Sequence, residues 1–137
     1  MSRSRSARIA GHRVGRGAPF DALDTLTSCD PIRLETRDAV FTYRVLPIPG
    51  EVLGPGCSSM PRLPEPYDGV VGREIVAPTE TAVLAAVPDR PELVPAVPAS
   101  LLTLTTCHPR FSARQRLVLH AVLTETSPTT PAQERPA

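Results

Sequence analysis

Leu101-Leu102-Thr103-Leu104-Thr105-Thr106-Cys107-His108-Pro109 is the stretch of sequence that decides the fold of this chain. Leucine and threonine dominate its first six positions, which is typical of a β-strand, and Pro109 prevents the strand from continuing. The cysteine therefore lies where the predicted strand ends and the chain turns. A thiol held at such a position can be directed at a substrate.

A second predicted strand follows over residues 116–124, where Arg116 precedes the apolar run Leu117-Val118-Leu119-His120-Ala121-Val122-Leu123. Side chains alternate between the two faces of a strand, so Leu117 and the residues in phase with it form the face that looks buried. Arg116 and His120 share the opposite face with valines. Arg116 is therefore an isolated charge among apolar residues.

The rest of the chain supports an all-β class with long loops. Seventeen prolines and eight glycines separate segments rich in valine, leucine and threonine, and proline and glycine interrupt regular structure at those places. Residues 32–36 and 40–45 alternate on either side of a tight connection, which predicts a hairpin. About six strands are expected in all. The hairpin supplies two, four more lie at residues 73–77, 81–85, 101–106 and 116–124, and residues 9–12 could be the end of a further strand.

The length of 137 residues predicts one domain, which we place at residues 9–125. Residues 1–8 alternate serine and arginine and are expected to form a flexible arm, while residues 126–137 form a polar tail. Residues 46–72 are so rich in proline and glycine that we expect an insertion or long loop there, with disorder favoured.

Composition excludes several classes of function. All fifteen basic residues are arginine, and fourteen acids leave a net charge of +1, which gives no general case for nucleic-acid binding. No apolar stretch reaches the roughly 18 residues of a membrane span, and none at the N-terminus resembles a signal peptide. Three cysteines without Cys-x-x-Cys spacing suggest neither a disulfide framework nor a zinc site, so Cys29 and Cys57 receive no role.

Cys107 and Arg116 are the residues best suited to covalent chemistry. A thiol attacks at neutral pH when a neighbouring imidazole or guanidinium lowers its pKa or accepts its proton. An arginine fork directed at that site stabilises the negative charge on a carbonyl oxygen under attack. The alternatives are a small buried hydrophobic cysteine and an arginine that pairs with a surface acid. Arg114, which has the same parity as Arg116, is the second candidate for the arginine.

Three histidines compete for the role of acid or base. His12 lies between glycine and arginine at the possible end of a strand, which suits an exposed imidazole. His108 follows the cysteine directly and is expected on the opposite face, and His120 is more simply a strand residue. A metal-binding module built from Cys107, His108 and His12 is a weaker alternative, because consecutive strand residues diverge. We therefore expect no metal and no cofactor.

Residues 102–117, Leu-Thr-Leu-Thr-Thr-Cys-His-Pro-Arg-Phe-Ser-Ala-Arg-Gln-Arg-Leu, resemble the active-site segment of sortases, most closely that of actinobacterial class E sortases. Ala10-Gly11-His12-Arg13, followed by Gly17-Ala18-Pro19-Phe20 and Leu23-Asp24, resembles the sortase histidine loop. Glu74-Ile75-Val76-Ala77-Pro78-Thr79 resembles a third block of that family. The resemblance covers most of residues 10–124 outside the 46–72 segment.

The resemblance implies a cysteine transpeptidase with Cys107 as nucleophile, His12 as general acid/base or imidazolium partner, and Arg116 as the oxyanion-stabilising and substrate-positioning residue. Its partners would be surface proteins that carry a Leu-x-x-Thr-Gly sorting signal, Leu-Ala-x-Thr-Gly in class E, and an amine of a peptidoglycan precursor. A thioester would link the two steps.

The resemblance also implies a sortase-like β-barrel at the extracellular face of the cell membrane. In that family the histidine lies near the middle of the domain and follows a membrane anchor, whereas here it is residue 12. The early strands of the barrel and the anchor are therefore expected to be absent from this chain. A truncated, non-catalytic sortase-like fragment is the alternative function.

Overall fold

The computed structural model describes residues 7–10, 25–85, 87–93, 99–108 and 115–128, with the backbone alone at residues 7–10, 59, 107 and 108. These residues form β-strands and short 3-10 helices and contain no α-helix. Within the same residues no helix has the length and apolar character needed to cross a membrane. The predicted all-β class is confirmed.

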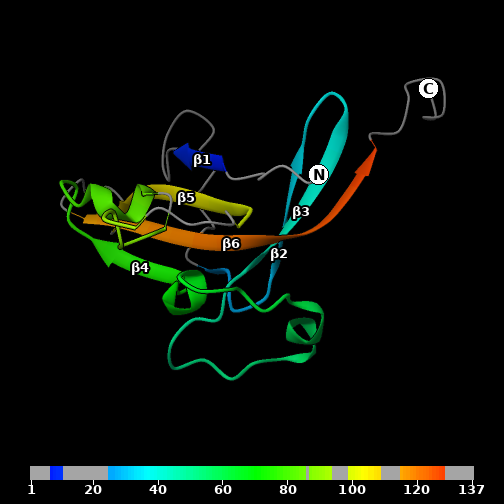
Figure 1. Ribbon diagram of the computed structural model, residues 1–137, viewed down its shortest axis with the longest axis horizontal. Helices are drawn as coiled ribbons and strands as arrows, with labels where there is room; N and C mark the ends of the chain where they lie inside the picture. The colour runs from blue at the N-terminus through cyan, green and yellow to red at the C-terminus, as the bar shows by residue number, and fades with distance from the viewer. Residues whose placement is uncertain (1–6, 11–24, 86, 94–98, 109–114, 129–137) are drawn as a thin grey trace.

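The strands form a single six-stranded sheet, in agreement with the predicted number. The order is β1-β5-β6-β3-β2, and β4 also pairs with β6. Their bounds are β1 (Ala7–Ala10), β2 (Pro31–Glu35), β3 (Ala39–Val45), β4 (Arg73–Val76), β5 (Leu101–His108) and β6 (Gln115–Pro128). Figure 1 shows β6 running through the sheet as its longest strand, with β1 and β5 on one side and β4 on the other.

Strand β6 is the central strand of the sheet, because three other strands pair with it. β5 pairs antiparallel along one edge, from Gln115 to Val122. β4 and β3 share the other edge, β4 opposite residues 116–119 and β3 opposite residues 121–128. Both faces of the middle of β6 are buried, since Leu119 and Val118 are both fully inaccessible to solvent. The sequence pattern indicated one buried face, and burial of the second comes from the loops that cover it.

Two apolar clusters occupy the two faces of the sheet. The larger contains Tyr43, Val45, Ile48, Leu102, Leu104, Leu117, Leu119 and Ala121. The smaller joins Leu101 and Val122 of the sheet to loop residues Leu46, Tyr67 and Val87. Each fully buried side chain of this size contributes about 1.5–3 kcal/mol, so the loops that complete the smaller cluster are part of the stable fold.

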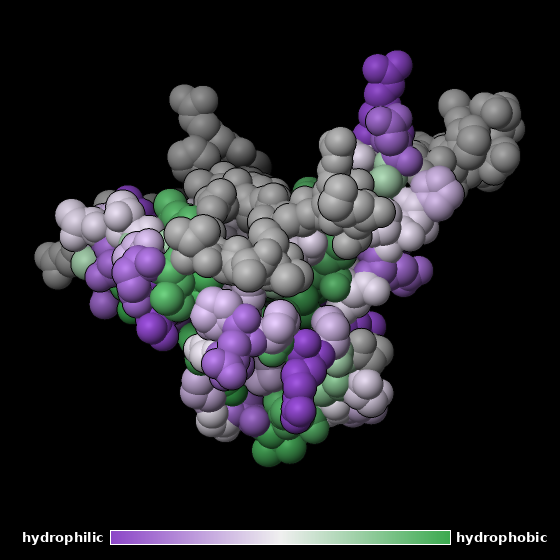
Figure 2. Space-filling model, in the orientation of Figure 1, coloured by the Kyte–Doolittle hydropathy of each residue, from purple (hydrophilic) through white to green (hydrophobic). Residues whose placement is uncertain are grey.

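The predicted hairpin is confirmed as β2 and β3, which pair from Pro31↔Arg44 to Glu35↔Val40. It projects from the body of the sheet in Figure 1, and hydrophilic residues cover its tip in Figure 2. The pairing of β3 with β6 shifts register between Thr42 and Tyr43. Thr124 occupies the extra position on β6, and its hydroxyl donates to the carbonyl of Thr42 at 3.1 Å.

The prediction that disorder prevails over residues 46–72 was wrong. This segment contains η2 (Pro55–Ser59) and η3 (Tyr67–Gly69), and Tyr67 is 1% exposed. Its ends meet beside β6, where the amide of Gly72 donates to the carbonyl of Pro47 at 3.1 Å. A Cβ at Gly72 would overlap the carbonyl oxygen of Leu46, so glycine permits this close approach. Proline and glycine here shape an ordered loop.

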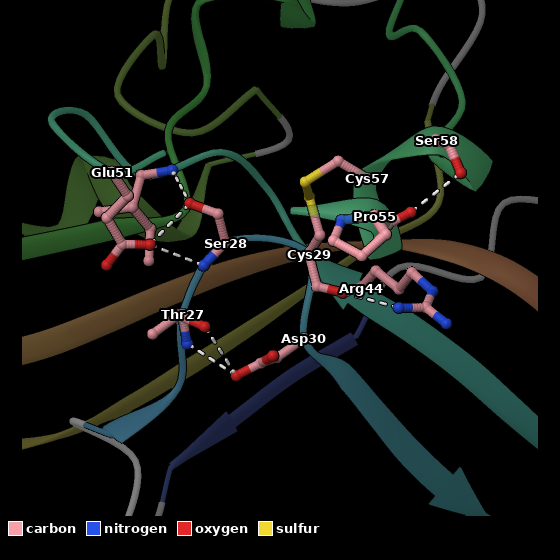
Figure 3. Close-up of a disulfide and its surroundings, with 10 residues drawn as sticks. Thr27, Ser28, Cys29, Asp30, Arg44, Glu51, Pro55, Cys57 and Ser58 are labelled. Atoms are coloured by element: carbon pink, nitrogen blue, oxygen red, sulfur yellow. Dashed lines mark hydrogen bonds between the residues drawn. A yellow bond between two sulfur atoms is a disulfide. The ribbon is translucent and has the colours of Figure 1, made fainter. Parts of the chain in front are cut away.

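Cys29 and Cys57 form a disulfide across 28 residues of sequence (Figure 3). Cysteine number and spacing suggested no disulfide framework and assigned these two residues no role, because spacing in sequence does not show which loops the fold brings together. The bond ties η2 to the turn before β2, where Cys29 is buried and adopts a left-handed φ of 69°. Arg44 Nη1 donates to the Cys29 carbonyl at 2.8 Å.

Three other predicted boundaries need correction. Residues 81–84 form the 3-10 helix η4 (Thr81–Leu84) and no strand, with the Glu80 carboxylate accepting from the Ala82 amide. β1 begins at Ala7, inside the predicted arm, because parallel pairing with β5 extends that far. β6 continues to Pro128, inside the predicted tail, because the hairpin pairs with it. Residues 1–6 and 129–137 lie outside the described residues.

Candidate active site

Cys107 and Arg116 are direct cross-strand partners in the antiparallel pair β5 and β6. Opposite residues in such a pair have Cα atoms about 4.5–5.5 Å apart. The sequence analysis singled out these two residues separately, and the register places their backbones side by side. The pairing sits where β5 ends and β6 begins, as expected for groups that must reach a substrate.

Arg116 also has a neighbour on its other side, because Val76 of β4 pairs with it. The side chain of Arg116 is half-buried, and its Nη1 donates to the carbonyl of Gln115 at 3.3 Å. The guanidinium thus belongs to the middle strand of three at this end of the sheet. Pairing on both edges holds the Arg116 backbone in place, while its half-buried side chain remains partly accessible to solvent.

The third predicted site residue, His12, lies outside the described residues, as does Arg114. The strand that precedes His12 is nevertheless described. β1 runs parallel to β5, and its last residue, Ala10, pairs with Thr105. In sequence, His12 follows Ala10 by two residues, and Cys107 follows Thr105 by two residues. Of His108 only the backbone is described.

His120 was expected to be a residue of the strand, and the structure gives it defined partners. Its ring is fully buried. Nδ1 lies 2.9 Å from Thr103 Oγ1, and Nε2 lies 2.8 Å from Glu74 Oε2. His120 is the cross-strand partner of Thr103. It lies four residues along β6 from Arg116, a distance of about 13 Å at the rise of a β-strand. His120 is therefore a separate buried polar centre.

Glu74 and Asp89 extend this polar centre to the surface, and the sequence analysis assigned a role to neither. Desolvation, and next the hydrogen bond and charge of Glu74, raise the pKa of Asp89 to about 7. Burial opposes ionisation of Glu74, but hydrogen bonds from His120 and Asp89 outweigh it and lower the pKa of Glu74. Only the fold reveals this set, because its members come from segments far apart in sequence.

An open groove of about 1000 Å³ lies elsewhere, under the segment between β3 and β4. Its walls run from Leu46 to Val71 and include Cys57 and Tyr67, and none of them belongs to β5 or β6. Figure 2 shows hydrophobic surface at the lower tip of the molecule, over this segment. The groove is therefore distinct from the Cys107–Arg116 pair, and that pair is the better candidate for catalysis.

The register thus places a residue type that can act as a nucleophile opposite one that can stabilise an oxyanion. Comparison with known proteins agrees. A family model described as the sortase domain matches residues 1–124. The chain belongs to the sortase family, whose members are cysteine transpeptidases of the cell envelope, and the predicted resemblance is confirmed.

The curated relatives are class E enzymes. Sortase SrtE1 of Streptomyces coelicolor is 29% identical over 120 residues, which are 88% of this chain and 27% of that protein. Sortase SrtE2 of the same organism is 28% identical over 118 residues, 86% of this chain and 36% of that protein. The chain thus spans about a third or less of their length. The solved structure of SrtF sortase from Corynebacterium diphtheriae matches with a TM-score of 0.76 and 34% identity over 98% of this chain and 70% of that one.

Proposed function

We propose that this chain carries the catalytic site of a sortase that cleaves a Leu-x-x-Thr-Gly type sorting signal, Leu-Ala-x-Thr-Gly in particular, and transfers the protein to an amine of a peptidoglycan precursor. Cys107 is the nucleophile, His12 the general acid and base, and Arg116 the residue that stabilises the oxyanion and positions the substrate. The Cys107↔Arg116 register carries the proposal.

The chemistry follows from these groups. The Cys107 sulfur attacks the threonine carbonyl carbon, and the carbonyl oxygen becomes negatively charged beside the Arg116 guanidinium. The bond between threonine and glycine then breaks, with the imidazolium of His12 supplying the proton of the departing amine. The resulting thioester is attacked by the acceptor amine, which gives its proton back to His12 and releases the thiolate.

The disulfide supports a site outside the cytoplasm. Disulfides such as Cys29–Cys57 form and persist in oxidising compartments and are rare where glutathione keeps thiols reduced. We accordingly place this domain at the outer face of the cell membrane. Its partners there are surface proteins that bear the sorting signal, together with the peptidoglycan precursor.

Peptide cleavage tests the proposal. A fluorogenic Leu-Ala-x-Thr-Gly peptide should be cleaved by the wild-type chain, and Cys107→Ala should abolish cleavage. Arg116→Lys keeps the charge but loses the planar fork, and we expect a rate about 100-fold lower, in line with the loss of one oxyanion donor. Arg90→Lys is the matched control, because Arg90 is exposed and pairs only locally with Glu92.

A capped peptide and a small amine, monitored by mass spectrometry, separate cleavage from transfer. Acylated Cys107 should accumulate when the amine is omitted, and His12→Ala should suppress it. A chain that unfolds cooperatively yet never acylates Cys107 would defeat the transpeptidase proposal. That result would instead favour the alternative of a non-catalytic sortase-like fragment.

A further inference from the structure

Glu74, Asp89 and His120 form a cluster of ligand-type side chains outside the proposed catalytic site. One ligand atom from each lies within 4.8 Å of the others. Glu74 comes from β4, His120 from β6, and Asp89 from the connection between β4 and β5. Three separate segments therefore converge on one point.

The imidazole is already oriented as a ligand would be. His120 is fully buried, and its Nδ1 lies 2.9 Å from the buried hydroxyl of Thr103. A hydrogen-bond partner at one ring nitrogen is the usual feature that fixes the orientation of a metal-binding histidine. The other nitrogen, Nε2, faces Glu74 Oε2 at 2.8 Å. Its direction toward the carboxylates is thus set by the core.

The charges around Asp89 favour a cation. The carboxyl oxygens of Glu74 and Asp89 lie within 4.8 Å of each other, and two negative charges at that distance repel unless a proton or a cation lies between them. Glu80 adds a further negative charge acting on Asp89. A divalent ion in the place of that proton would neutralise both carboxylates. Since Asp89 is exposed, the ion has a route from solvent.

We propose that Glu74, Asp89 and His120 bind a divalent transition-metal ion, with Zn²⁺ and Mn²⁺ as the fitting ions and Ca²⁺ as a poor one. Metal–ligand distances of about 2.0–2.2 Å require ligand atoms some 3.4 Å apart in a tetrahedral site. The Glu74 carboxylate, 2.8 Å from Nε2, would therefore move outward slightly, and all three ligand atoms already lie within 4.8 Å of one another. An imidazole ligand favours transition metals, whereas Ca²⁺ takes oxygen ligands. Water from the exposed side completes the coordination.

The ion would tie together parts of the fold that lead to Cys107. Its ligands join β4 to β6 directly and hold the connection at Asp89, which continues into β5. Metal binding should therefore raise the melting temperature, because a ligand that binds only the folded state stabilises it by mass action. This effect does not depend on the proposed peptidase activity.

Metal binding is measured on tag-free, EDTA-treated Cys107→Ala/His12→Ala protein, a parent in which neither catalytic side chain can hold the ion. Isothermal titration with Zn²⁺, Mn²⁺ and Ca²⁺ gives stoichiometry and Kd. We expect one equivalent of Zn²⁺ with micromolar or lower Kd, a melting temperature several degrees higher, and at least 10-fold weaker binding of Ca²⁺. Co²⁺ should give visible absorption bands of a site with mixed nitrogen and oxygen ligands.

Variants assign the site. Asp89→Asn and Glu74→Gln should each raise the Kd for Zn²⁺ at least 10-fold, while Asp38→Asn, an exposed acid in the hairpin turn, should leave it unchanged. Circular dichroism checks that the variants remain folded. The proposal is overturned if the wild-type chain binds one equivalent of Zn²⁺ but the Cys107→Ala/His12→Ala parent binds none, because the catalytic side chains would then hold the ion. Equal affinity of the parent and Asp89→Asn would overturn it as well.

Discussion

Breaking the Cys29–Cys57 disulfide should remove a large part of the stability of this domain. The bond closes a loop of 28 residues, and the chain-entropy relation then gives about 3.6 kcal/mol of stabilisation at 25 °C. Small domains are stable by only about 5–15 kcal/mol. Loss of this bond alone would therefore remove between about a quarter and three quarters of such a stability.

A second effect acts at Cys29 and can be separated from the first. Its left-handed φ of 69° costs a residue with a Cβ about 1–2 kcal/mol, which glycine does not incur. The pair Cys29→Gly/Cys57→Ala should therefore be about 1 kcal/mol more stable than Cys29→Ala/Cys57→Ala, although neither can form the bond. The Cys29 amide still donates to the Val45 carbonyl in both.

The assay is equilibrium urea unfolding in a Cys107→Ala parent, where no free thiol can exchange with the disulfide. The parent is measured with and without a phosphine reductant, and the two double variants are measured beside it. Reduction and Cys29→Ala/Cys57→Ala should give the same loss, about 3–4 kcal/mol, and both should raise the slope m, because the unfolded chain without the cross-link is more expanded. Reductant should leave both double variants unaffected.

A loss below about 1 kcal/mol would refute the reasoning, because it would mean that the loop is held by its apolar contacts and gains nothing from the covalent bond. Equal stability of the glycine and alanine variants would refute the part that concerns Cys29. Amide exchange across residues 46–72 shows which contacts remain. The hydrogen bonds from Ser28 to Glu51, visible in Figure 3, provide a second attachment.

Three further predictions concern particular side chains. Gly72→Ala should destabilise the fold by about 3 kcal/mol in thermal or urea unfolding, because the added Cβ would overlap the backbone of Leu46. Gly54→Ala is the control: a Cβ there would meet nothing within 4 Å, so stability should change by less than about 0.5 kcal/mol. Thr103→Val should lower the free energy of unfolding by about 1–3 kcal/mol, because valine keeps the shape of the threonine side chain but leaves the buried Nδ1 of His120 without its hydrogen-bond partner. An unchanged unfolding midpoint would argue against that hydrogen bond. The backbone and hydroxyl hydrogen bonds of Ser28 lower the pKa of Glu51 from its ordinary value of 4.5. The stabilisation is thus present above that pH and lost as the pH falls through the lowered pKa. Melts of wild type and Glu51→Gln should therefore differ most near neutral pH and converge in acid, below the lowered pKa.

The strands were predictable because they are local patterns. Alternation over residues 32–45 predicted the β2–β3 hairpin, the Leu-Thr run predicted β5, and the apolar run predicted the part of β6 before its extension to Pro128. The sequence could not indicate that β6 is buried on both faces, because its second face is covered by residues such as Tyr67 and Val87 from distant loops. Alternation of apolar and polar residues indicates which side chains of a strand share a face, but it does not indicate which other segments pack on that face.

The site was predictable in part for a related reason. The types of residue at 107 and 116 indicated the chemistry. The register that makes them cross-strand partners comes from the structure, because two antiparallel strands can be aligned in more than one way. The buried set of Thr103, Glu74 and His120 was missed, because its residues are ordinary in their own strands and acquire a role only through pairing. The disulfide was missed because a separation of 28 residues carries no pattern.

The arrangement along β6 explains how one strand can serve both stability and chemistry. Its middle, from Leu117 to Val122, is fully covered and holds the polar centre at His120. Its first residues are different: Gln115 is exposed and Arg116 is half-buried, so side chains there are available to a substrate. Cross-strand pairing fixes the Arg116 backbone from both sides, since Cys107 and Val76 are its neighbours. The buried middle of β6 thus supports the end of the strand that carries Arg116, as the proposed stabilisation of an oxyanion by that residue would require.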